Sequence, residues 1–149
     1  MTELNMLVRK IFPEELAWAN EQYSEINFKL STESDLIAIA EINGVKAGLG
    51  RLCAVDNKAG ELGGMFVLPD FRGHAIAANI VDFLLKNSNY STLYCLAFAH
   101  LEVFYKRFGF LPVDETKSVP KEVTDKFLWC RDTYDSSVLL MCREEFFTD

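Results

Sequence analysis

The hydrophobic pattern changes its period at Pro69, and this change constrains the fold more than any other feature of the chain. A run of β-type residues precedes Pro69, an amphipathic helical stripe follows it, and a second buried strand comes next. The three segments are residues 61–68, 76–87 and 92–99. Because a strand, a helix and a strand follow one another, the sequence predicts a right-handed parallel crossover.

A hairpin signal precedes this crossover. Residues 35–42 and 45–55 are apolar, β-type runs joined by Asn43-Gly44, a pair that tolerates the positive φ angles of a type I′ turn. A second turn over residues 56–60 leads into the strand at 61–68. The sequence therefore predicts three antiparallel strands in a meander.

Further elements flank these strands. A strand is predicted over residues 5–11, and Pro13 with Glu14 and Glu15 is typical of the first turn of a helix. A helical stripe over residues 101–108 ends at Gly109, the usual position of a C-terminal cap, and residues 137–142 predict a last strand. Together these elements predict an α/β fold of the mixed α+β kind, with helices on the faces of a sheet that is antiparallel early and parallel at the crossover.

Length and charge narrow the classes of function. The 149 residues are half hydrophobic, which favours a single domain over residues 1–149. The formal net charge of -7 repels phosphate backbones and anionic lipids, so neither a nucleic acid nor a membrane is an expected partner. The start of the chain lacks the layout of a signal peptide and no window has the length of a membrane span, so we expect a cytoplasmic protein.

The four cysteines are widely separated, and histidines, cysteines and carboxylates do not cluster at the spacings typical of metal ligands. We therefore expect reduced, mostly buried thiols and no metal ion.

The segment most informative about function is the turn between the strand at 61–68 and the helix that follows it. Free N–H groups at a helix start, with the positive end of the helix dipole behind them, form an anion site that small side chains let a pyrophosphate approach. A tight turn that needs small residues only for packing is the alternative. Gly63-Gly64 in the preceding strand indicates a bulge or a close approach of a ligand or another backbone.

Two motifs then indicate a family. The turn resembles the acetyl-CoA motif of GNAT acetyltransferases, with Arg72, Ala75 and Ala77 at its fixed points, and residues 104–110 are similar to the family's Phe-Tyr-x-x-x-Gly-Phe helix. The resemblance is firm from Val45 to Val113. It implies a GNAT-like, mostly antiparallel sheet of about six or seven strands with helices on both faces and one parallel βαβ crossover.

The resemblance also implies a binding site for acetyl-CoA as cosubstrate. Pantetheine would pair with the bulged strand at Met65, Phe66 and Val67. The pyrophosphate would rest on the turn formed by Arg72, Gly73, His74, Ala75, Ile76 and Ala77. The bulge at Gly63-Gly64 would leave an N–H free to polarise the thioester carbonyl.

Two residues are candidates for catalysis. Tyr105 matches the family tyrosine that protonates the departing thiolate, with a core tyrosine as the alternative. Glu61 lies where some family members hold a glutamate base, acting directly or through water. Its alternative is a solvated charge at the start of a strand, since many relatives bind amines that are already neutral enough to attack.

The tail favours one acceptor class. Residues 110–114, 119–120 and 136–140 resemble the end of the acetyltransferase domain of N-acetylglutamate synthases, which implies a small-molecule amine such as an amino acid or a related metabolite. A protein lysine or N-terminus is the other acceptor that the sequence leaves open. A non-catalytic acyl-CoA-binding module is a further alternative, and a homodimer is also left open.

Overall fold

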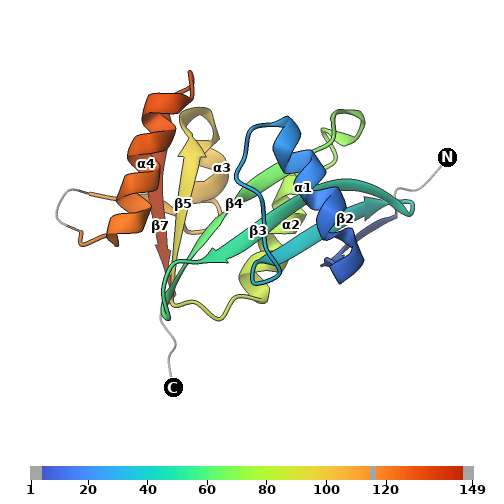
Figure 1. Ribbon diagram of the computed structural model, residues 1–149, viewed down its shortest axis with the longest axis horizontal. Coiled ribbons are helices and arrows are strands. Elements are labelled where there is room, and N and C mark those ends of the chain that lie inside the picture. The colour runs from blue at the N-terminus through green and yellow to red at the C-terminus, as the bar shows by residue number, and fades with distance from the viewer. Residues whose placement is uncertain (1–4, 115–116, 146–149) are drawn as a thin grey trace. The chain divides into compact units, whose positions relative to one another are not determined.

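The computed structural model describes residues 5–114 and 117–145, which form a mixed sheet with helices beside it (Figure 1). The strand order is β1-β2-β3-β4-β5-β7-β6, mostly antiparallel with one parallel pair, β4–β5, as the crossover predicts. The strands are β1 (Met6–Lys10), β2 (Leu36–Ile42), β3 (Val45–Ala54), β4 (Ala59–Val67), β5 (Thr92–Phe98), β6 (Leu111–Pro112) and β7 (Val138–Glu144). The α-helices are α1 (Leu16–Glu25), α2 (Ile76–Lys86), α3 (Glu102–Lys106) and α4 (Lys121–Thr133). Short 3-10 helices are η1 (Pro13–Glu15), η2 (Pro69–Phe71) and η3 (Ala99–Leu101).

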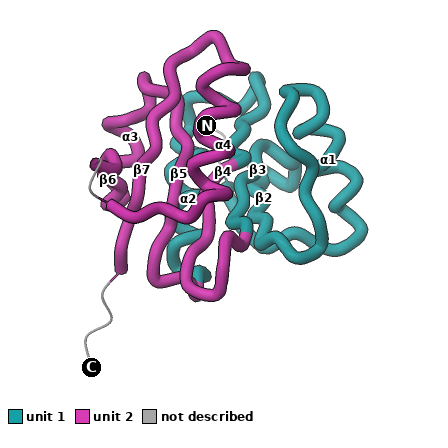
Figure 2. The backbone as a smooth tube through the Cα atoms, turned by 60° about the vertical axis from the view of Figure 1, so that its left-hand side comes forward, with its two compact units in different colours: residues 1–53, 64–88 teal, residues 54–63, 89–149 magenta. Residues whose placement is uncertain are grey.

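The chain divides into two compact units, which Figure 2 shows in different colours. The first comprises residues 1–53 and 64–88, and the second comprises residues 54–63 and 89–149. Strand β4 contributes its first half to the second unit and its last residues to the first unit. The two units are described separately below.

The predicted hairpin is confirmed in the first unit. Strands β2 and β3 pair antiparallel, with Ile42 opposite Val45. Asn43 and Gly44 join them with φ angles of 50° and 81°, the left-handed conformations that a type I′ turn requires. Strand β1 pairs antiparallel with β2, so the strand predicted over residues 5–11 is also present.

The two faces of β3 contact different helices because successive side chains alternate across a strand. Leu49 lies in a buried cluster with Ala19 and Tyr23 of α1. Gly48 and Gly50 lie on the opposite face of β3 from Leu49. A Cβ atom added to Gly50 would lie 2.7 Å from a side-chain carbon of Ile80 on α2. The absence of side chains at these glycines therefore lets α2 lie close against the strand.

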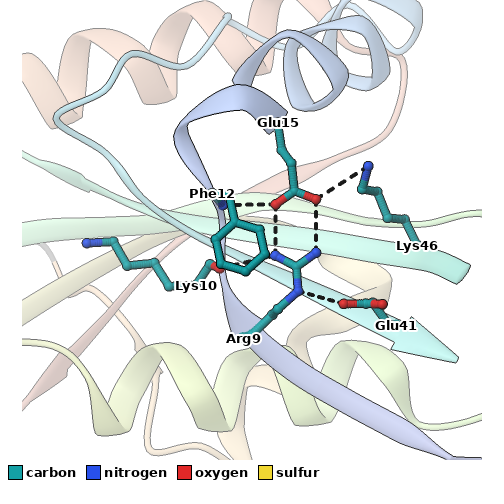
Figure 3. A network of polar contacts seen from close by, with 6 residues as sticks. All are labelled: Arg9, Lys10, Phe12, Glu15, Glu41 and Lys46. Atoms are coloured by element: carbon teal, nitrogen blue, oxygen red, sulfur yellow. Dashed lines mark hydrogen bonds and ion pairs between the residues drawn. The ribbon is translucent and has the colours of Figure 1, made fainter. Parts of the chain in front are cut away.

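An ion-pair network holds the start of the first helix against the sheet (Figure 3). The Glu15 carboxylate accepts hydrogen bonds from both terminal nitrogens of Arg9, at 2.8 and 2.9 Å, and from the Phe12 N–H at 2.9 Å. Arg9 also donates to Glu41 of β2 at 2.6 Å. The Arg9 guanidinium is the main reason that the pKa of the buried Glu15 carboxyl is lowered to about 2.

Replacing Glu15 by Gln is expected to lower the free energy of unfolding by about 1–3 kcal/mol at neutral pH, because a half-buried guanidinium loses its bidentate partner. Since folding lowers the pKa of Glu15 from 4.5 to about 2, its contribution is complete above pH 4.5 and is lost as the pH falls toward 2. Urea unfolding at several pH values measures both effects. The control is Glu14→Gln in the same turn, where the carboxylate is exposed; an equal loss there would contradict the role of the network.

The second unit is built around β5, which pairs in parallel with the first half of β4 and antiparallel with β7. The predicted stripe over residues 101–108 forms η3 and α3, and Gly109 follows with a φ of 89° as the predicted cap. Helix α4 is not predicted by the sequence analysis. Only Val123 and Cys130 along it are buried, so its apolar stripe is too narrow to produce a clear helical period.

Candidate functional site

The turn between β4 and α2 has the geometry of an anion-binding helix start. Ala75 precedes the helix with a left-handed φ of 58°, and residues 72–75 are exposed. The Asn79 N–H donates to the Ala75 carbonyl at 3.2 Å, so the N–H groups of residues 76–78 lie before the intrahelical ladder. These donors, with the helix dipole behind them, can bind a phosphate group.

The side chains of the turn leave this backbone open. Arg72 Nε donates to the Val67 carbonyl at 3.2 Å and so ties the turn back to the end of β4. Gly73 has a φ of 92°, and no atom lies within 4 Å of the position where its Cβ would stand. His74 is exposed beside it. The backbone N–H groups of the turn are therefore not covered by these side chains.

The glycine pair interrupts the regular geometry of β4. Gly64 has a φ of 61°, and its carbonyl accepts a hydrogen bond of 2.9 Å from the Tyr23 hydroxyl of α1. A Cβ atom on Gly64 would stand 2.6 Å from that hydroxyl oxygen, so only glycine fits. Met65, Phe66 and Val67 follow directly and are half-buried.

Tyr105 lies in the interior of the second unit, only 5% exposed. Its ring packs edge to face against Phe104 and Phe110, with centroids 5.0 and 6.0 Å away. Its hydroxyl shares a hydrogen bond with the thiol of Cys95 on β5. Burial raises the pKa of Tyr105, so the phenol keeps its proton at neutral pH and can act only as an acid there.

Glu61 is not the solvated charge that the sequence leaves as an alternative. Its side chain is 13% exposed, and its carboxylate accepts a 2.7 Å hydrogen bond from Lys126 Nζ of α4. Sequence reasoning missed Lys126, which lies 65 positions away on a helix that no periodicity signals.

The two candidate catalytic residues belong to one group of side chains in the second unit. Cys95 shares a hydrogen bond with Tyr105 and also interacts electrostatically with Glu61 and Lys126. Burial raises the pKa of the Cys95 thiol, so this cysteine is an uncharged neighbour of the two residues at neutral pH. The binding residues predicted at 65–67 and 72–77 lie in the first unit.

Residues 5–114 and 117–145 contain neither a candidate metal site nor a candidate membrane-spanning helix. No group of three or more His, Cys, Asp and Glu side chains there could hold a metal ion. No helix in the same part of the chain is long and apolar enough to cross a membrane. The four cysteines are free thiols, and three of them are buried as predicted.

Comparison with known proteins agrees with this geometry. The family model for the acetyltransferase (GNAT) domain matches residues 33–112, more than half of the chain. No curated protein sequence matches the chain.

Some of the solved structures with the same fold contain CoA or acetyl-CoA. Rv2747 of Mycobacterium tuberculosis, in complex with CoA and NLQ, superimposes with a TM-score of 0.71 at 20% identity, covering 94% of this chain and 99% of that one. A GNAT family acetyltransferase of Elizabethkingia anophelis with acetyl-CoA bound gives 0.64 at 19%, covering 95% and 99%. N-acetylglutamate synthase of Neisseria gonorrhoeae, with coenzyme A and N-acetyl-glutamate, gives 0.68 at 17% and covers 98% of this chain but only 36% of its own.

Proposed function

Because this chain belongs to the GNAT acetyltransferase family, we propose that it transfers the acetyl group of acetyl-CoA to a primary amine of a small molecule, such as an amino acid or a related metabolite. The observation that carries the proposal is the exposed turn at residues 72–75 between β4 and α2, with Ala75 left-handed and the first N–H groups of the helix outside the intrahelical ladder.

The binding part of the proposal rests on the first unit. The N–H groups of Arg72, Gly73, His74, Ala75, Ile76 and Ala77 would hold the pyrophosphate, and Met65, Phe66 and Val67 would pair with the pantetheine arm. The break in the pleat at Gly64 supports an N–H group left free beside the thioester carbonyl. Such a donor stabilises negative charge as it develops on the acetyl oxygen.

The chemical part rests on the second unit. The amine nitrogen bonds to the acetyl carbon while the carbon–sulfur bond breaks, so the nitrogen loses a proton and the sulfur gains one. We assign to Tyr105 the donation of the proton that the sulfur gains, because the Tyr105 phenol is protonated at neutral pH. We assign to Glu61 the role of accepting the proton that the nitrogen loses, directly or through water.

The acceptor class has support from two directions. The end of the chain resembles the acetyltransferase domain of N-acetylglutamate synthases, and one neighbour in fold is such a synthase with N-acetyl-glutamate bound. This chain spans about a third of that synthase.

The proposal is tested by incubating the protein with acetyl-CoA and a panel of amines while the release of free thiol is recorded. We expect turnover with at least one small primary amine and none without an amine. Thermal shift with CoA, acetyl-CoA and unrelated nucleotides is the companion measurement, since only a ligand of the native state raises the melting temperature. Failure of both assays would remove the proposal.

Glu61→Gln is expected to lower kcat/KM at neutral pH by about tenfold or more, because the amide cannot accept a proton. The matched control is Lys126→Met, which breaks the same 2.7 Å ion pair but keeps the carboxylate. We expect the control to retain kcat/KM within about threefold. Equal losses of kcat/KM in both variants would instead indicate that Glu61 matters only through its ion pair with Lys126, as a structural contact.

A further inference from the structure

Arg51 of β3 is a buried cation without an acidic partner among the residues that the structure describes. It is 5% exposed, and no carboxylate of the described residues forms an ion pair with it. The contrast within the same unit is Arg9, which contacts both Glu15 and Glu41. A buried charge is costly unless it is paired, so an unpaired guanidinium at this depth calls for an explanation.

The contacts that Arg51 does make are with neutral groups and use only part of its donors. Its Nη1 donates to the Ser31 hydroxyl at 2.6 Å, and its guanidinium carbon lies 4.1 Å from the centre of the Tyr23 ring. Every fully buried side-chain nitrogen of the described residues has a partner, so Nε and Nη2, which bond to no atom of residues 5–114 and 117–145, still touch solvent. These two nitrogens form the side-on fork that matches the two oxygens of a carboxylate.

This fork lies beside the interruption in β4. A Cβ atom on Gly64 would stand 2.8 Å from Arg51 Nε, so the backbone of β4 passes close to the guanidinium at this glycine. Gly64 directly precedes the residues to which we assign the pantetheine arm. An acid group held by Arg51 would therefore lie one residue from the segment proposed to present the acetyl group.

We propose that Arg51 binds the carboxylate of the acceptor through Nε and Nη2, which makes the acceptor an amino acid and not a plain amine. The inference rests on the proposed function and names the substrate class of the same site. The net charge of -7 repels anions in general, so recognition of an acid requires such a local cation. The Ser31 hydroxyl takes up only Nη1, and the Tyr23 ring packs against the guanidinium.

The competing role for Arg51 is purely structural. Asn20 of α1 clamps Ser31 through two hydrogen bonds, of 2.7 and 3.1 Å, and Arg51 joins this clamp through the Ser31 hydroxyl. Arg51 could thus serve only to hold the segment after α1 against the sheet. Ser31→Ala removes the bond to Arg51 but keeps the fork, so it separates the two roles.

The test is calorimetric titration of the CoA-saturated protein with the standard L-amino acids and with their α-carboxamides. We expect at least one amino acid to bind about tenfold or more tightly than its carboxamide. Arg51→Gln should reduce this ratio to within about twofold, Arg51→Lys should keep part of it, and Ser31→Ala should keep it in full. Circular dichroism monitors the folding of each variant. If a variant does not fold, the ratio of amino-acid to carboxamide affinity in the wild type still tests the proposal.

The outcomes are distinct. A wild-type protein that binds carboxamides as well as amino acids, or that binds no amino acid, would overturn the role of Arg51, as would an unchanged ratio in Arg51→Gln. If plain amines are acetylated without preference for a carboxylate, the proposed function stands and this inference fails. If no amine is acetylated but the ratio depends on Arg51, the carboxylate site stands and the proposed function fails.

Discussion

We expect Tyr105→Phe to lower kcat by about ten- to a thousandfold while leaving the affinity for acetyl-CoA almost unchanged. Phenylalanine keeps the ring and its edge-to-face packing against Phe104 and Phe110, so only the hydroxyl is lost. Because burial raises the pKa of Tyr105, the wild-type hydroxyl remains a proton donor throughout the neutral range. Steady-state kinetics with acetyl-CoA and the best amine of the panel measures the effect.

Cys95→Ala is the matched control for this variant, because the Cys95 thiol shares a hydrogen bond with the Tyr105 hydroxyl. It leaves the hydroxyl in place, so kcat should stay within about threefold of the wild type. Tyr105→Phe itself should cost about 1 kcal/mol of stability or less, since it loses one weak hydrogen bond to sulfur. Full turnover in Tyr105→Phe would make the residue a packing residue only.

Ala75→Glu is expected to weaken acetyl-CoA binding by about a hundredfold or more. The new carboxylate would stand at the exposed, left-handed residue that opens α2, where it would occupy the N–H groups and repel the pyrophosphate. Stability should hardly change, because the native alanine already has the φ of 58° and an acidic side chain is favourable at a helix start. Calorimetry with CoA measures the loss of affinity, and thermal unfolding measures stability.

Ala75→Gly provides the control at the same position. Glycine adopts a left-handed φ without a steric penalty, so the turn and the affinity for CoA should be preserved. Unchanged affinity in Ala75→Glu would contradict the assignment of the pyrophosphate to this turn. Loss of affinity in both variants would show that the alanine side chain itself matters and not the charge.

Local patterns were sufficient to predict the elements to which we assign the cosubstrate site. The turn chemistry of Asn43-Gly44 predicts the first hairpin, and the change of period at Pro69 predicts the crossover and its small-residue turn. The glycine pair at 63–64 likewise predicts the break in β4. Each of these signals acts over a few residues, through backbone dihedral angles and the period of apolar side chains, so a sequence displays it directly.

The partners of the functional side chains were decided only by the tertiary structure. Lys126 reaches Glu61 from 65 positions away, on a helix whose narrow apolar stripe gave no signal. The Tyr23 hydroxyl meets the Gly64 carbonyl across 41 positions, and Ser31 meets the buried Arg51 across 20. No local rule links these residues, because the contacts form only after the strands pair and the helices pack against them. The sequence by itself therefore determined the strands, the crossover and its turn, and packing within each unit determined which charged side chains are paired, as Glu61 is with Lys126.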